Sequence, residues 1–182
     1  MAERQAHGFR FEQKIKDILD VNEVKSYTSK WDIGDSISIK FISSRGTIDM
    51  GSVVRIFEAL ERGNWTMILG RHTDKVCDAV YELFFTEEIC KKLMGDLTLQ
   101  DVVEFDNAIK SFGPGKHNEA RAYAKAWKEE NKHKMGMLTI QPKIDSKNQR
   151  RVQCGINRTN LEKLFELETC STFEKLVGEN FG

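Results

Sequence analysis

The chain has 182 residues, of which 40% are hydrophobic and 31% are charged. This length favours one domain, or a core with a small subdomain, and the composition provides enough apolar side chains for a buried core. Lys plus Arg and Asp plus Glu each total 28, so the formal net charge is zero. That balance argues against a polybasic, histone-like protein, and two prolines with 13 glycines exclude collagen-like and Pro-rich disordered classes.

Targeting and cofactor motifs are absent from the sequence. No apolar run approaches the roughly 20 residues that a membrane span needs, and residues 1–10 contain no apolar signal-peptide core. We therefore expect no membrane partner and a cytoplasmic, intracellular location. The four histidines lack metal-ligand spacing, and residues 113–116 lack the strand and the Ser or Thr of a phosphate-binding loop. Reduced thiols rather than a zinc site are expected at the four widely spaced cysteines, Cys77, Cys90, Cys154 and Cys170.

The N-terminal elements are a helix and two strands. Residues 8–21 carry apolar side chains at helical spacing. Residues 27–33 predict a short strand that ends at Gly34. Residues 36–42 alternate apolar and polar side chains, which predicts a strand with one buried face. The two strands together predict an antiparallel hairpin that turns at Gly34 and Asp35.

The middle of the chain completes a mixed α/β pattern. We expect a loop over 43–47, a helix from Ser52 to about Gly63, a buried strand over 65–70, a strand over 79–85 and a helix over 86–94. Beyond residue 98 the pattern predicts helices over 99–112, 118–134 and 157–167, with strands over 137–140 and 151–156 around a polar turn. The fold class is therefore α/β, a mixed central sheet flanked by helices.

The segment from Asp32 to Glu58 carries the most chemistry. Asp32 ends one predicted strand, and Ser38 and Lys40 lie on the polar face of the next. A hairpin with this spacing brings the Asp32 carboxylate and the Lys40 ammonium to one edge. A nuclease can hydrolyse a phosphodiester with Mg2+ held on oxygen ligands, which polarises the phosphate and lowers the pKa of an attacking water. A lysine beside that water can orient it or stabilise the developing charge.

Trp31-Asp32 followed by Ser38-Ile39-Lys40, after a helix that bears Glu12, resembles the PD-(D/E)xK nucleases, and the type II restriction endonucleases among them. The resemblance covers about residues 8–72. It implies a restriction-endonuclease-like core: a helix, a strand ending in a metal-binding Asp, a strand with (D/E)xK, then a further helix and strand. It also implies that Asp32 binds Mg2+, that Lys40 serves the attacking water, and that Glu12 completes the metal shell or holds a metal-bound water.

Two positions depart from the family pattern. Trp31 stands where proline is common, and Ser38 stands at the acidic position two residues before Lys40. Some restriction enzymes with Ser-x-Lys supply the missing carboxylate from the following helix. Glu58 is therefore the candidate for a second metal ligand, with Asp35 and Asp49 in reserve.

Charge is distributed unevenly along the chain. Residues 110–158 contain twelve Lys and Arg against four Asp and Glu, so this segment carries 12 − 4 = +8, and the remainder carries −8. Arg121, Lys125, Lys128 and Lys132 recur at i, i+4, i+7 and i+11, which places a basic stripe on one helix face. Such a stripe suits phosphate contacts, with Tyr123 and Trp127 packing inward.

Residues 141–153 are rich in Gln, Asn, Lys and Arg within a predicted two-stranded ribbon. A ribbon fits the major groove of DNA, where Arg reads guanine and Asn or Gln reads adenine. A polar hairpin turn is the alternative interpretation. The predicted DNA-binding set is Lys116, Arg121, Lys125, Lys128, Lys143, Lys147, Asn148, Gln149, Arg150 and Arg151.

These features together predict a Mg2+-dependent type II restriction endonuclease that cuts double-stranded DNA as a homodimer. Residues 1–95 form the expected catalytic core, and residues 96–182 form a helical and β-ribbon DNA-recognition subdomain of the same single domain. The proposed catalytic residues are Asp32, Lys40, Glu58, Glu12 and Ser38. Two alternatives stay open: a junction-resolving or repair nuclease of the same superfamily, and a non-catalytic DNA-binding protein, which the Ser at position 38 favours.

Overall fold

The protein is described by a computed structural model that covers residues 3–23, 25 and 29–182. It is a mixed α/β fold flanked by helices, which confirms the expected α/β class, but its strands form two three-stranded sheets and not the one central sheet that was expected. The chain divides into two compact units, the first formed by Met1–Gly46, Asn64–Phe85 and Glu162–Gly182, the second by Thr47–Gly63 and Thr86–Leu161. These units do not coincide with a boundary at residue 95, because each is assembled from segments that lie far apart in the sequence.

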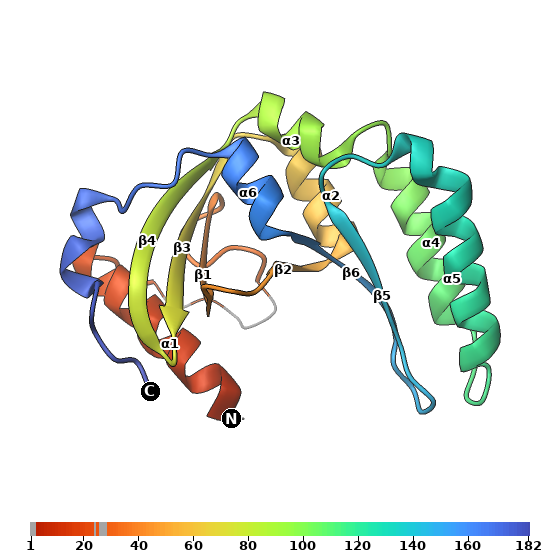
Figure 1. The fold of residues 1–182 in the computed structure, drawn as a ribbon, viewed down its shortest axis with the longest axis horizontal. Coiled ribbons are helices and arrows are strands. Elements are labelled where there is room, and N and C mark those ends of the chain that lie inside the picture. The colour runs from red at the N-terminus through yellow and green to blue at the C-terminus, as the bar shows by residue number, and fades with distance from the viewer. Residues whose placement is uncertain (1–2, 24, 26–28) are drawn as a thin grey trace. The chain divides into compact units, whose positions relative to one another are not determined.

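The first unit is built on a sheet with the strand order β1-β3-β4 (Figure 1). Strand β3 is central and almost entirely buried, as its apolar run predicts; β1 pairs with it in parallel and β4 antiparallel. The alternation expected for β1 is confirmed, since Ile39 and Phe41 are buried. The elements of this unit are α1 (Glu3–Ile18), β1 (Ile37–Ser43), β3 (Trp65–Thr73), β4 (Val76–Phe85) and the 3-10 helix η2 (Ser171–Leu176).

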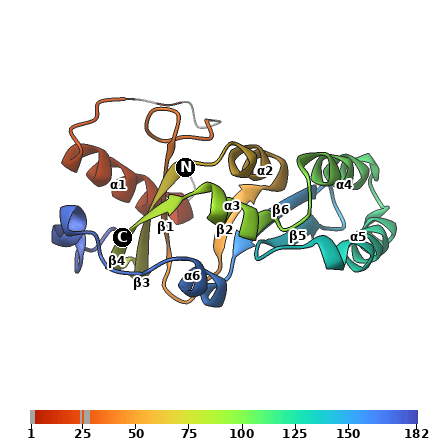
Figure 2. The ribbon, with the colours of Figure 1, turned by 90° about the horizontal axis from the view of Figure 1, so that it is seen from above.

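Helix α1 lies beside β1 (Figure 2). A cluster of buried aromatic side chains joins the two elements. The Phe11 and Phe41 rings stack with their centroids 4.5 Å apart. Gly70 on β3 makes this approach possible, because a Cβ there would lie 2.4 Å from Phe11 Cζ. Phe173 and Phe181, near the C-terminus, complete the same core.

The prediction of a strand over residues 27–33 is wrong for residues 29–33. Residues 27 and 28 lie outside the described part of the chain. Residues 29–31 form no strand, and Ile33 makes only an isolated bridge with Ile37. A tight turn through Gly34, which has a φ of +56°, returns the chain before a second strand can pair with β1. The apolar side chain of Trp31 packs instead edge-to-face on Trp65. The expected hairpin is therefore only a turn.

The second unit is built on an antiparallel sheet with the strand order β2-β6-β5. Strand β2 was not expected from the sequence, and it contains a bulge between Asp49 and Gly51, where Gly51 has a φ of +88°. The buried Asp106 carboxylate accepts a hydrogen bond from the Val152 N–H, one residue beyond the last pair of β2 with β6. The elements are β2 (Ile48–Ser52), α2 (Val53–Arg62), α3 (Glu87–Met94), α4 (Leu99–Ser111), α5 (His117–Asn131), η1 (Lys132–Lys134), β5 (Thr139–Ile144) and β6 (Arg150–Ile156).

Local sequence patterns predicted the positions of most helices correctly. Helix α2 ends at Gly63 as predicted, and Thr86 accepts a hydrogen bond from the Ile89 N–H to begin α3. The last α-helix, α6 (Arg158–Leu164), ends earlier than expected, and η2 follows where no element was predicted. Within the described residues, every helix is too short or too polar to cross a membrane.

We expect Gly70→Ala to destabilise the protein strongly. The added methyl overlaps the Phe11 and Phe41 rings in a closely packed core, and such overpacking costs about 1–3 kcal/mol. A thermal melt measures the loss as a drop of several degrees in melting temperature. Gly113→Ala is the matched control, because a Cβ there meets no heavy atom within 4 Å. Equal melting temperatures for Gly70→Ala and Gly113→Ala would contradict the packing described here.

Candidate functional site

Asp32 lies at the outer edge of the first sheet, in the turn that precedes β1. Its backbone N–H donates to the Ile37 carbonyl at 2.8 Å, and its Oδ2 accepts from the Ile39 N–H at 2.6 Å. Strand β1 is the end strand of the sheet, so its outward N–H groups need partners from outside the sheet. The Asp32 carboxylate therefore has a defined position on the edge of β1.

Three charged side chains interact electrostatically with this carboxylate. Glu12 and Lys16 come from α1, where Lys16 Nζ lies 2.8 Å from Glu12 Oε1, and Lys40 comes from β1. Lys16 is only 7% exposed. A lysine is almost never buried to this extent unless a carboxylate pairs with it, and Glu12 is that partner. We call Asp32, Glu12, Lys16 and Lys40 the Asp32 cluster.

The pKa of the Asp32 carboxyl is raised above its ordinary value. Burial is the largest cause, and the hydrogen bond from the Ile39 N–H opposes it. The negative charge of Glu12 raises the pKa further, whereas the positive charges of Lys40 and Lys16 lower it. A half-buried carboxyl with opposing charged neighbours, as Asp32 is, is a frequent property of functional sites.

The Asp32 cluster contains three of the residues singled out from the sequence, Asp32, Lys40 and Glu12. Ser38 lies half-buried on β1, on the same strand face as Lys40. Lys16 was missed by sequence reasoning. Its spacing of four residues from Glu12 is the signal that could have found it, although such pairs are usually solvent-exposed.

The candidates for a further carboxylate lie in different parts of the fold. Asp35 is exposed in the same turn as Asp32. Glu58 is exposed on α2, and Asp49 on β2 accepts from the Gly51 N–H, so both belong to the second unit. Among the described residues, no group of three or more His, Cys, Asp or Glu side chains is arranged to hold a metal. The roles of these carboxylates stay predictions.

The polar turn of the second unit joins β5 to β6. Asp145 Oδ1 accepts from the backbone N–H groups of Lys147 and Gln149 at 3.0 and 2.8 Å, bonds that lower the pKa of this carboxyl. Arg150 donates to the carbonyls of Asp145 and Gly113, so its guanidinium holds the turn in place. Lys147, Asn148 and Arg151 are exposed.

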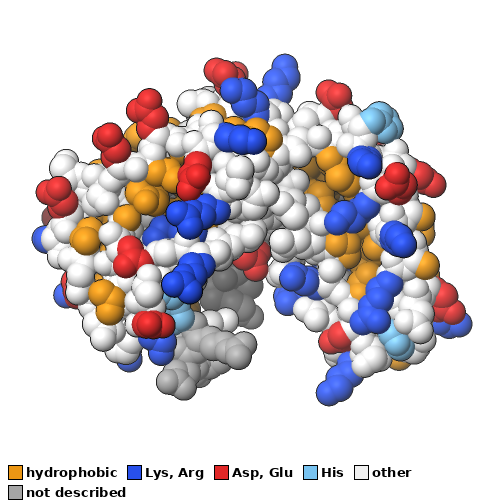
Figure 3. Space-filling model, viewed as in Figure 1, with side chains coloured by type: hydrophobic (Ala, Val, Ile, Leu, Met, Phe, Trp, Pro, Cys, Tyr) orange, Lys and Arg blue, Asp and Glu red, His pale blue; other side chains and the backbone are white. Residues whose placement is uncertain are grey.

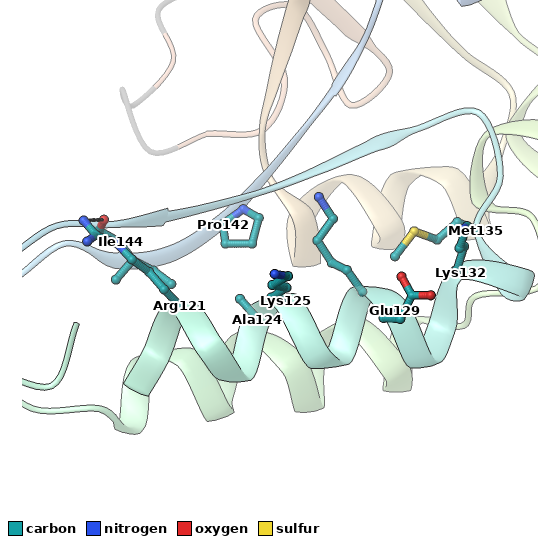
Figure 4. A pocket seen from close by; sticks show the side chains of 9 residues that line it. Arg121, Ala124, Lys125, Glu129, Lys132, Met135, Pro142 and Ile144 are labelled. Atoms are coloured by element: carbon teal, nitrogen blue, oxygen red, sulfur yellow. Dashed lines mark hydrogen bonds between the residues drawn. The ribbon is translucent and has the colours of Figure 1, made fainter. Parts of the chain in front are cut away.

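The basic stripe of α5 faces β5 across a groove of about 520 Å³ (Figure 4). Arg121 Nη2 donates to the Ile144 carbonyl and Lys128 Nζ to the Ile140 carbonyl, each at 3.1 Å. Lys and Arg side chains lie among apolar ones along α5 in the space-filling view (Figure 3). Lys116, exposed before α5, approaches Glu119 at 3.8 Å, and Lys143 on β5 is half-exposed.

The aromatic side chains of α5 behave differently from each other. The Trp127 ring stacks on the Phe105 ring of α4 with their centroids 3.9 Å apart, as the inward orientation predicted from the sequence requires. The Tyr123 ring also lies beside the Phe105 ring, with the two ring centroids 6.3 Å apart. The Tyr123 side chain is 40% exposed, however, so its predicted inward packing is only partial. These contacts fix the orientation of α5 and hence of its basic face.

Comparison with known proteins gives no match: no family model, no curated protein and no solved structure is detectably similar to this chain.

We expect Asp32→Asn to melt at a higher temperature than the natural chain at about pH 8. Burial disfavours the ionised carboxyl in the folded protein, and the raised pKa therefore costs stability at any pH above it. The asparagine amide avoids this cost while its oxygen still accepts from the Ile39 N–H.

The difference in melting temperature should shrink as the pH is lowered toward about 4, because the folded Asp32 carboxyl binds a proton before the unfolded one does. Melts of both proteins across this range measure it. Asp17→Asn, an exposed change on the same helix as Glu12, is the control and should give no such gain. A lower melting temperature for Asp32→Asn near pH 8 would refute the electrostatic description of the site.

Proposed function

We propose that the protein is a Mg2+-dependent type II restriction endonuclease, which hydrolyses phosphodiester bonds of double-stranded DNA at a short specific sequence. The observation that carries the proposal is the Asp32 cluster: Asp32, Lys40 and Glu12 are close enough for their charges to interact. The order of these residues in the sequence is that of the PD-(D/E)xK nucleases. The proposal assigns a restriction-endonuclease-like core to the first unit and DNA recognition to the second.

The Asp32 cluster fits a divalent cation on chemical grounds. Asp32 and Glu12 carry like charges that oppose each other, and burial adds to the cost of ionised Asp32. A divalent cation would stabilise both ionised carboxylates, and Mg2+ prefers such oxygen ligands. When bound, Mg2+ would polarise the scissile phosphate and make a bound water more acidic.

Each side chain of the cluster has a part in this chemistry. Asp32 would hold the metal, with its second oxygen kept in place by the Ile39 N–H. The Lys40 ammonium would orient the attacking water and stabilise the negative charge that develops on the phosphate. Lys16 would position Glu12 through their 2.8 Å ion pair.

DNA recognition would rely on the second unit. The exposed side chains of Lys147, Asn148 and Arg151 at the turn of the β5–β6 ribbon are suited to base edges and phosphates. Arg150 would act indirectly, since it bonds backbone carbonyls. A homodimer would supply one such site for each strand of a palindromic target.

A non-catalytic DNA-binding protein is the second candidate. The bond from the Ile39 N–H gives Asp32 a structural role that needs no metal, and the described residues present no three-carboxylate group. Incubation with phage DNA and Mg2+ separates the candidates: discrete bands support restriction, a smear supports a non-specific nuclease, and intact DNA supports the binding protein. Preference for branched over linear DNA would instead indicate a junction-resolving or repair nuclease.

We expect Lys40→Ala to lower the rate of DNA cleavage by about 100- to 1,000-fold, because it removes a charge that stabilises the transition state. Binding to the same DNA in Ca2+ should change little. Cleavage is followed on gels and binding by mobility shift, with Lys14→Ala, an exposed change on α1, as the control. Normal cleavage by Lys40→Ala in Mg2+ would show that the assigned active site is wrong.

The resemblance to enzymes with Ser-x-Lys implies that Glu58 is the further carboxylate, with Asp35 and Asp49 in reserve; of these three, only Asp35 belongs to the same unit as Asp32. Loss of the further carboxylate should abolish Mg2+-dependent cleavage, so Glu58→Gln, Asp35→Asn and Asp49→Asn are assayed side by side. Glu61→Gln, an exposed change on the same helix as Glu58, is the control that should retain cleavage. Normal cleavage by all three variants would contradict the assignment.

A further inference from the structure

The groove between α5 and β5 has walls of two chemical kinds. Four cations line it together with a single carboxylate, Glu129: Arg121, Lys125 and Lys128 of α5, and Lys132 at the start of η1. Apolar surface comes from both sides and includes Ala124 of α5 and Pro142 and Ile144 of β5 (Figure 4). A ligand that fits both kinds of wall has regularly spaced negative charges and an apolar body. Nucleic acid has this character, because its phosphates seek cations and its sugars and bases pack on apolar surface.

The width of the groove is set by two side chains that cross it. Arg121 and Lys128 each start on α5 and reach a carbonyl of β5 at 3.1 Å. The walls are therefore one side chain apart, whereas the major groove of duplex DNA alone is about 12 Å wide. A duplex can touch only the rim of this groove. A single strand is narrow enough to enter it.

The length of the basic stripe favours a chain over a single nucleotide. From Arg121 to Lys132, the residue that directly follows α5, the chain advances by about 16 Å along the helix axis. At about 3.4 Å per nucleotide in stacked DNA, this length spans roughly five phosphates. A mononucleotide could contact only part of the stripe, whereas a strand contacts all of it.

The wall formed by β5 is poorly suited to an added peptide strand. Such a strand would need free backbone donors and acceptors along β5. Pro142 has no N–H, and the carbonyls of Ile140 and Ile144 already accept from Lys128 and Arg121. The same features do not hinder a nucleic acid, which binds the cations rather than the strand edge.

We propose that the α5–β5 groove binds a single-stranded segment of nucleic acid, with the phosphates along Arg121, Lys125, Lys128 and Lys132 and the bases or sugars against Pro142 and Ile144. The inference rests on the proposed function for the identity of the polyanion, DNA. It goes beyond that function, whose substrate is duplex DNA, by adding that the second unit also holds an unpaired DNA strand. Lys128 and Arg121 exchange their β5 carbonyls for phosphate oxygens when the strand binds.

The test measures binding of a fluorescent oligothymidylate of about 12 nucleotides, a length typical of single-strand sites, and of a duplex of equal length. Lys125→Gln/Lys132→Gln should weaken oligothymidylate binding about tenfold and duplex binding no more than about twofold. Two lost phosphate contacts should also reduce the slope of log K against log salt by about 1.4 for the single strand. Lys91→Gln/Lys92→Gln on α3 is the charge-matched control and should change neither ligand's binding.

Several outcomes would overturn the inference. These are equal losses for duplex and single strand, equal losses in the control variant, and an unchanged salt slope. Competition by polyglutamate as effective as that by oligothymidylate would assign the groove to an acidic peptide instead.

Failure of the nuclease proposal has a separate signature. In that case the natural chain binds oligothymidylate through the groove but leaves every DNA uncut in Mg2+. Conversely, a chain that cuts duplex but binds oligothymidylate equally well with or without Lys125 and Lys132 would refute the groove alone.

Discussion

The first unit depends on one close approach between a helix and a strand. Helix α1 approaches the sheet closely where β3 has no side chain, at Gly70, and the Phe11 and Phe41 rings stack over that position. Glu12 follows Phe11 directly, and Lys16 lies one helical turn beyond it, so the apolar contact also fixes where these two charges lie. The charge environment of Asp32 is in this way a product of hydrophobic packing.

The parts of the fold that could be predicted are those specified by local patterns. The alternation of β1, the apolar run of β3 and the Thr86 cap of α3 each arise from neighbouring residues. Strand β2 could not be predicted, because it is five residues long, has a bulge, and pairs with β6 about one hundred residues later in the chain. For residues 29–33 the sequence predicted a strand that does not form, because aromatic and β-branched side chains favour strands but also pack well in turns.

The candidate site can likewise be divided into residues that local sequence patterns predict and residues that only tertiary packing reveals. Glu12, Asp32 and Lys40 stand out because their order along the chain is visible in a sequence, although Asp32 is held in a turn and not at the end of the expected strand. Burial of Lys16 is not visible, because its ion pair with Glu12 has the spacing of an ordinary exposed pair and only tertiary packing covers it. The stripe of α5 was equally apparent, but its opposite wall required the knowledge that β5 packs along it.

The way the chain is threaded ties the two units together. The chain passes between them at residues 46–47, 63–64, 85–86 and 161–162. Phe173, Leu176 and Phe181 belong to the core of the first unit, although every strand of the second unit precedes them in the sequence. Neither unit is a continuous stretch of chain, so no single truncation isolates one of them. The contribution of each unit can therefore be separated only by point substitutions in the whole chain.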